Sequence, residues 1–175
     1  MTPASTAATS VDVIVIGGGA AGLMCAIVAG RRGRRVRVIE HANRCGKKIL
    51  MSGGGRCNFT NTGTTAANFV SGNPHFCKSA LARYTPQHFI GMVEGHGIAY
   101  HEKELGQMFC DESSKQIVKM LLDECADAGV RIDTYCKTKG LPVRAILGLF
   151  LQVAQAVAHA HALLVVHRDL KPAHI

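Results

Sequence analysis

Three glycines, Gly17, Gly19 and Gly22, have the spacing of a dinucleotide-binding turn. They follow the apolar run 11–16 and open an Ala-rich stretch, so the pattern predicts a strand, a tight turn and a helix. In such a turn Gly17 permits the sharp bend, Gly19 lets a diphosphate approach the backbone, and Gly22 lets the helix pack close to the strand. The free N–H groups at the start of the helix then form an anion site.

A single acid, Glu40, ends the second strand-like run, 35–40. It follows the turn by about twenty residues, where a carboxylate in this type of unit accepts hydrogen bonds from an adenosine ribose. The alternative is a glycine turn in an α/β sheet that binds no nucleotide. The joint occurrence of strand, turn, helix, strand and acid favours the nucleotide site.

Segment 45–61 contains three consecutive glycines, Gly53, Gly54 and Gly55, which are costly in regular helices and strands. The segment as a whole has neither helical nor strand periodicity. Polar or cationic side chains flank the glycines: Lys48, Ser52, Arg56, Asn58 and Asn61. We therefore predict a second loop that contacts the phosphates or the ring of a ligand, with a flexible surface loop as the alternative. Cys57, in the same loop, is either a redox group or a small packing residue.

Helix and strand patterns indicate the elements that would position these segments. A helix is expected over 20–32, followed by Gly33 as its stop signal. Its core-facing residues are expected to be Leu23, Met24, Ile27 and Val28. Two further helices are predicted, one opening at Thr85-Pro86 and one running from Ser113 or Ser114 to Ala128. Strand-like pieces at 98–101 and 130–134 complete a pattern typical of α/β proteins.

The composition bounds the class of protein and its partners. A chain of 175 residues, 47% of them hydrophobic, is expected to form one globular domain with room for part of another. The formal charge of +8 owes much to the arginines at 31–37, which indicate a solvated basic turn. Trp is absent and no second basic face is evident, so we expect no nucleic-acid partner.

The cysteines indicate the compartment in which the protein works, and the two ends of the chain indicate whether it carries a secretory signal or a membrane span. Seven cysteines without paired metal spacing predict reduced thiols in a cytoplasmic protein and no metal site. Residues 1–10 are expected to form a disordered tail, because they lack the charged and apolar regions of a secretory signal. The apolar run 141–166 is interrupted by two glutamines and two histidines, so a buried helix over 145–161 is favoured over a membrane span.

Residues 11–137 resemble the bacterial NAD(P)/FAD-dependent oxidoreductases known as aminoacetone-oxidase-like FAD-binding enzymes. The resemblance rests on the glycine turn, Glu40, the string GKKILMSGGGRCNFTN and the stretch 104–136. It implies FAD in a Rossmann-like domain, NAD(P)H as a candidate electron donor, and a second domain inserted between the halves of the FAD domain. Members of that family are longer, so the resemblance also implies that the FAD domain of this chain is incomplete.

The same resemblance implies roles for individual residues. Those implied to hold the pyrophosphate are Gly17, Gly19, Ala20, Ala21 and Gly22, and Glu40 is implied to bind the ribose. Those implied to lie along the flavin side of the cofactor are Lys48, Ser52, Gly53, Gly54, Arg56, Cys57 and Asn58. No catalytic acid or base is assigned, and the identity of the small-molecule substrate and the oligomeric state stay open.

The C-terminal segment 141–175 resembles a different family, the bacterial Ser/Thr protein kinases. It looks like the helix before their catalytic loop followed by the loop itself, HRDLKPA at 167–173. The resemblance implies that Asp169 accepts the proton of a substrate hydroxyl and that Lys171 stabilises the transferred phosphate. His174 stands where that family has a metal-binding Asn, and His is a poor ligand for Mg²⁺. With a junction at 138–140, the hypothesis is a truncated or chimeric chain.

Three functions are consistent with these patterns. The first is an FAD-binding flavoprotein oxidoreductase, represented by its N-terminal portion. The second is a protein Ser/Thr kinase fragment, and the third is a non-catalytic nucleotide-binding module. The expected fold class is α/β, with a truncated Rossmann-like FAD-binding βαβ domain over 11–137 followed by a mostly helical kinase-like fragment.

Overall fold

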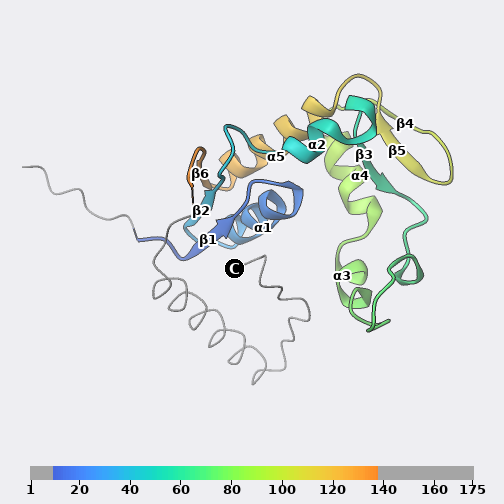
Figure 1. Ribbon diagram of the computed structural model, residues 1–175, viewed down its shortest axis with the longest axis horizontal. Coiled ribbons are helices and arrows are strands. Elements are labelled where there is room, and N and C mark those ends of the chain that lie inside the picture. The colour runs from blue at the N-terminus through green and yellow to red at the C-terminus, as the bar shows by residue number, and fades with distance from the viewer. Residues whose placement is uncertain (1–9, 138–175) are drawn as a thin grey trace, which may run out of the picture. The chain divides into compact units, whose positions relative to one another are not determined.

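A computed structural model of the protein describes residues 10–137. Three parallel strands, β1 (Val13–Ile16), β2 (Val36–Ile39) and β6 (Arg131–Asp133), form a sheet in the order β1-β2-β6 (Figure 1). Helix α1 (Ala20–Arg31) joins β1 to β2, so the predicted strand–helix–strand unit is confirmed. β6 lies where the alternating residues 130–134 predicted a strand.

The core of this layer forms where α1 packs against α5 (Ser114–Asp127). Leu23 and Ile27 of α1 and Leu121 of α5 are fully buried there. The start of α5 is fixed by the predicted cap, because Ser113 Oγ accepts a hydrogen bond from the Lys115 amide at 3.2 Å. The two helices therefore form as local sequence signals predict.

One residue of α1 that was predicted to be buried is exposed. Val28 was expected to face the core but is 41% exposed. It lines an open cavity of about 610 Å³ whose wall also includes Cys25 and Tyr84. The apolar face of α1 is wider than the part of the helix that α5 and the sheet cover. Helical periodicity alone therefore placed Val28 wrongly, on the buried side.

A second sheet has three antiparallel strands in the order β3 (Asn58–Asn61), β5 (Gln107–Cys110) and β4 (Tyr100–Glu102). β4 corresponds to the strand expected at 98–101. β3 lies inside segment 45–61, which also contains helix α2 (Lys47–Met51) and the 3₁₀ turn η1 (Ser52–Gly55). The segment is thus more regular than its sequence periodicity indicated.

Between β3 and β4 the chain forms η2 (Ala66–Asn68), α3 (Lys78–Arg83) and α4 (Pro86–Gly95). α4 begins at Thr85-Pro86 as predicted, and His88 Nδ1 accepts the Thr85 amide at 2.9 Å. The ring of Phe89 lies 5.9 Å, centroid to centroid, from the ring of Phe59 in β3. This aromatic contact joins α4 to the second sheet.

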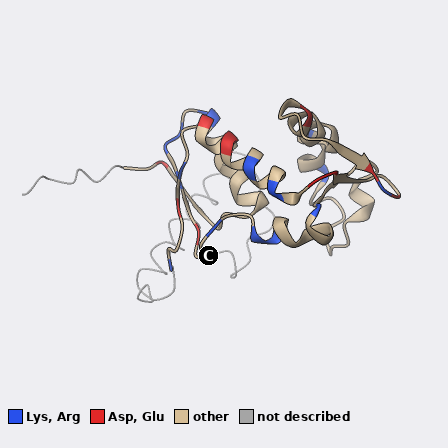
Figure 2. Cartoon of the chain, turned by 90° about the horizontal axis from the view of Figure 1, so that it is seen from above, with Lys and Arg blue, Asp and Glu red and all other residues tan. Residues whose placement is uncertain are grey.

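The arginines at 31, 32, 34 and 35 are exposed, as expected for a solvated basic turn, and several arginines of the run 31–37 also pair with acids. Figure 2 colours the basic and acidic residues along the chain. Arg31 pairs with Glu124 of α5, and Arg37 pairs with Asp133 of β6. The hydrogen bond from Arg37 holds the pKa of Asp133 below its ordinary value. These pairs link neighbouring elements, although ion pairs at such exposed positions contribute little to stability.

The expectations about membrane spans and metal sites can be compared with the structure only over the described residues. Within residues 10–137, no helix combines the length and hydropathy needed to cross a membrane. Over the same range, no group of three or more His, Cys, Asp or Glu side chains is placed to hold a metal ion. The expected tail up to residue 9, the junction at 138–140 and the kinase-like segment 141–175, including Asp169 and Lys171, lie outside the described residues.

Candidate functional site

The turn between β1 and α1 leaves backbone amides without partners. Gly17 has φ +100°, which strains any residue with a side chain, and its amide donates to Ile39 O at 2.8 Å. Among the described residues, none accepts a hydrogen bond from the amides of residues 19–22. These N–H groups lie at the N-terminus of a 12-residue helix, where the helix dipole favours negative charge. The turn therefore has the properties of an anion site.

The two later glycines of the turn have different surroundings. A Cβ atom at Gly19 would meet no heavy atom of residues 10–137 within 4 Å, so these residues leave the space beside the free amides open. A Cβ atom at Gly22 would overlap the carbonyl oxygen of Gly17 and lie 3.3 Å from Val15 Cγ1. Gly22 thus permits the close packing of α1 on β1, whereas Gly19 keeps the anion site accessible.

Glu40 lies directly after β2, as predicted, and its carboxylate accepts two backbone amides of the protein itself. Oε2 accepts the Gly18 amide at 2.6 Å, and Oε1 accepts the Ala42 amide at 2.7 Å. Burial by itself would raise the pKa of Glu40, but the amide hydrogen bonds and the neighbouring His41 outweigh it, and the pKa lies below its ordinary value. Glu40 therefore fixes the glycine turn, and its carboxylate oxygens keep lone pairs that can accept further hydrogen bonds.

We expect Glu40→Gln to destabilise the fold by about 1–3 kcal/mol at neutral pH, because an amide group cannot accept from both backbone N–H groups. The folded-state pKa of Glu40 is depressed. Its contribution is therefore present above the ordinary pKa of a glutamate and is lost as the pH falls through the folded-state pKa. Urea unfolding of the wild type and the variant should give free energies that differ at neutral pH and converge in acid. A difference that stays constant with pH would contradict this role.

The second glycine segment turns the chain from α2 into β3. Gly53 and Gly54 have φ values of +55° and +64°. The ring of Phe109 lies so close that a Cβ atom at Gly53 would be 2.7 Å from its Cε1. Ser52 Oγ donates to Ile49 O at 2.8 Å, and the Ser52 carbonyl accepts an amide at 3.1 Å. These contacts hold the segment in a 3₁₀ turn.

Cys57 follows this turn and is 4% exposed. Its φ of +57° is uncommon for a residue with a side chain. Burial raises the pKa of the Cys57 thiol, so the thiol keeps its proton at neutral pH. A protonated thiol is a poor nucleophile but can act as a proton donor.

A cavity of about 250 Å³ brings the two glycine segments together. The predicted site residues that line it are Ala20, Lys48, Ser52, Cys57 and Asn58. The rest of its wall is apolar and consists of Ile49, Phe59, Phe89, Ile117 and Leu121. The start of α1 therefore meets the second glycine segment at one cavity with both polar and apolar walls.

The other predicted site residues lie outside this cavity wall. They are Gly17, Gly19, Ala21, Gly22, Glu40, Gly53, Gly54 and Arg56. The apolar wall residues were not predicted as part of a site, because their types are those of ordinary core residues. They come from α2, β3, α4 and α5, which are far apart in sequence, and only the folded chain brings them together.

Comparison with known families gives one match that covers most of the chain. The model of the family described as HI0933-like protein Rossmann domain matches residues 11–167. This match confirms the Rossmann-like α/β class. It also runs across the predicted junction at 138–140 and over most of segment 141–175, so it gives no support to a separate kinase-like fragment.

Three curated relatives are similar to parts of the chain. The ribosomal RNA dihydrouridine synthase of Escherichia coli (strain K12) is 59% identical over 119 residues, which cover 68% of this chain and 30% of that protein. The protein of the same name from Haemophilus influenzae is 57% identical, with the same coverage. The 3-dehydro-bile acid delta(4,6)-reductase of Clostridium scindens is 39% identical over 72 residues, which cover 40% of this chain and 18% of that protein. The chain thus spans about 30% of the length of the first two relatives.

Proposed function

The chain belongs to the HI0933-like Rossmann domain family, and on that premise we propose that it is the FAD-binding part of a flavin-dependent oxidoreductase. The observation that carries this proposal is the cavity at which Ala20, at the start of α1, meets Lys48, Ser52 and Asn58. A dinucleotide needs an anion site for its diphosphate and a partly apolar space for its ring. Both features are present and adjacent in the described residues.

Different parts of the site suit different parts of FAD. The unpartnered amides of residues 19–22, beside the open space at Gly19, suit the pyrophosphate. Ligand pockets usually have volumes of about 300–1,000 Å³, so a cavity of about 250 Å³ suits one ring system rather than a whole dinucleotide. The apolar wall formed by residues such as Phe59 and Phe89 suits a flavin ring, and Lys48 and Asn58 supply donors to its polar edge.

The reaction that we propose for the complete enzyme is reduction of a uracil ring in RNA. Two relatives with more than half of the aligned residues identical are named ribosomal RNA dihydrouridine synthases, and the third is named a reductase. Formation of dihydrouridine adds a hydride to one carbon of the uracil C5–C6 double bond and a proton to the other. Reduced FAD supplies the hydride when it is bound, and NAD(P)H is the proposed source of its electrons.

The protein's own contribution to that reaction is to hold the rings and to supply the proton. Two titratable side chains line the cavity, Lys48 and Cys57. The Cys57 thiol lines the cavity and carries a proton at neutral pH, and this is the proton that we propose it donates to a ring carbon. An RNA substrate departs from the sequence-based expectation that the protein has no nucleic-acid partner.

The test uses the 175-residue chain loaded with FAD and reduced by dithionite without oxygen. A uridine-containing RNA should reoxidise the flavin and gain two hydrogens at uridine, measured by absorbance and by mass spectrometry of the nucleosides. The same RNA with cytidine at every uridine position is the control and should leave the flavin reduced. A parallel sample with NAD(P)H in place of dithionite tests the electron donor.

Each result of this test has a distinct meaning. A chain that takes up no FAD would contradict the cofactor assignment. A chain that holds FAD but treats the two RNAs alike would contradict the uracil reaction and favour a non-catalytic nucleotide-binding module. The kinase alternative is not proposed, because its residues Asp169 and Lys171 lie outside the described part of the chain and no comparison supports it.

A further inference from the structure

The stretch of chain between Glu40 and Glu94 contains no Asp or Glu. Its cationic residues are Arg44, Lys47, Lys48, Arg56, Lys78 and Arg83. The arginines at 31, 35 and 37, in contrast, are paired with acids. An anionic partner that approaches this acid-free stretch would meet no repulsive side chain from it.

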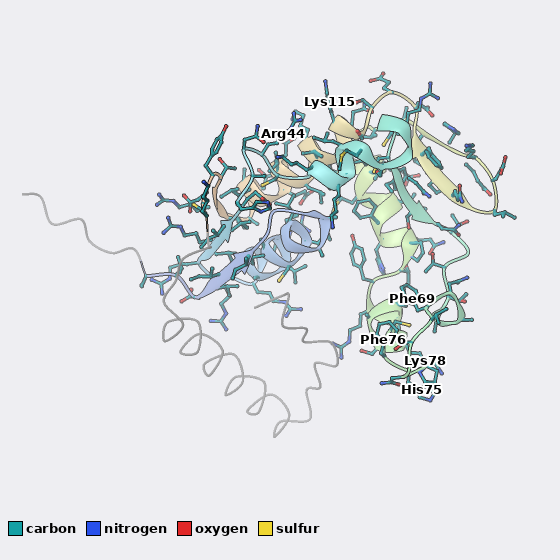
Figure 3. All side chains as sticks on the ribbon, in the orientation of Figure 1. Arg44, Phe69, His75, Phe76, Lys78 and Lys115 are labelled. Carbon is teal, nitrogen blue, oxygen red and sulfur yellow. The ribbon has the colours of Figure 1, made fainter. Side chains whose placement is uncertain are left out.

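An aromatic pair with one exposed ring lies within this stretch. The rings of Phe69 and Phe76 meet edge to face, with centroids 6.1 Å apart and an interplanar angle of 82°. Phe69 is 40% exposed, and neither ring belongs to the main hydrophobic core. Figure 3 shows Phe69, His75, Phe76 and Lys78 gathered together, apart from the cations Arg44 and Lys115. We call these four residues the Phe69 patch.

Local hydrogen bonds order the backbone that carries the Phe69 patch. The Thr65 amide donates to Asn68 Oδ1 at 2.7 Å, directly before Phe69. The His75 amide donates to Asn73 Oδ1 at 3.0 Å, directly before Phe76. Turns of this kind, in which Asn side chains bind nearby amides, fix a loop without a hydrophobic core beneath it. The two rings are therefore held at the surface by polar turns.

We propose that the Phe69 patch binds an unpaired base of an RNA substrate, with the ring of Phe69 stacked on the base and Lys78 and His75 at the flanking phosphate. The proposal rests on the proposed function, which supplies RNA as the class of substrate. Proteins recognise unpaired bases by stacking on aromatic side chains and track the phosphates with cations. An exposed ring beside the cation Lys78, in a stretch without acids, has that combination.

The test measures binding of a fluorescein-labelled, uridine-containing single-stranded RNA to the FAD-loaded chain by fluorescence anisotropy. Phe69→Leu keeps the apolar volume but removes the ring, so we expect Kd to rise about tenfold. Phe69→Tyr keeps the ring and should bind as the wild type does. Lys78→Gln should lower the slope of log Kd against log salt by about 0.7, the value for loss of one phosphate contact with a single strand.

Lys119→Gln provides the charge-matched control, because Lys119 is exposed on α5 and pairs with Asp123. This variant should retain the wild-type affinity and salt slope. FAD binding, measured in the same samples, should be unchanged in all four variants, which separates this surface from the cofactor site. Wild-type affinity in Phe69→Leu would overturn the proposal and leave the proposed function standing. A wild type that binds no RNA would overturn both the surface and the RNA substrate.

Discussion

Gly19→Val is expected to abolish FAD binding while leaving the fold intact. A Cβ atom at this position would meet no atom of the described part of the chain within 4 Å, and the backbone at φ −82° and ψ −179° is accessible to valine. The branched side chain would instead occupy the space beside the free amides of α1, where we place the diphosphate. We expect at least a hundredfold loss of affinity, about 3 kcal/mol, measured by titration of flavin fluorescence.

The matched measurement for Gly19→Val is its stability. Thermal unfolding followed by circular dichroism should give the wild-type midpoint, because nothing in the fold has to move. An unchanged FAD affinity in a folded variant would mean that the diphosphate does not lie beside Gly19. Retained binding would therefore count against the whole assignment of the turn, not against one residue.

Gly22→Ala is expected to destabilise the protein by roughly 2–4 kcal/mol, through overlap in a packed region. The added Cβ atom would overlap the carbonyl oxygen of Gly17, which is backbone and cannot rotate away. Gly22 is inside α1, where replacement of glycine by alanine otherwise stabilises a helix by about 1 kcal/mol. A destabilising sign is therefore diagnostic, and urea unfolding measures it.

Gly19→Ala is the control for Gly22→Ala, because the same atom is added three residues earlier in open space. Its free energy of unfolding should stay within about 0.5 kcal/mol of the wild type. Equal effects at the two positions would contradict the close approach of α1 to β1. The pair of variants thus separates the packing role of one glycine from the access role of the other.

The parts of the fold that the sequence predicted are those with local signals. Ser113 and Pro86 mark helix starts, and the apolar spacing of α1 and α5 is visible within each helix. The second sheet was only partly predicted, because β5 pairs with β3 from a distance in the chain, as Asn61 opposite Gln107 illustrates. Such pairing depends on the fold as a whole rather than on either strand.

One part of the candidate site could also be predicted from the sequence, and another part could not. The two glycine segments were recognisable in the sequence because a tight turn and a nearby diphosphate each restrict the residue types that fit at a position. The apolar wall was not, since Ile117 and Leu121 carry the same helical pattern whether or not a cavity lies beside them. The bonds of Glu40 to Gly18 and Ala42 could not be read from spacing either, because a carboxylate after β2 serves a ribose or a backbone amide equally well.

The most direct test of the central claim is the visible spectrum of the purified 175-residue chain after incubation with FAD and removal of free flavin by gel filtration. The account predicts a yellow protein with stoichiometric FAD and a flavin absorbance perturbed by the apolar wall around Phe59, and a colourless protein for Gly19→Val. A wild-type chain that elutes without flavin would contradict the claim that the free amides of α1 and the adjoining cavity form a cofactor site.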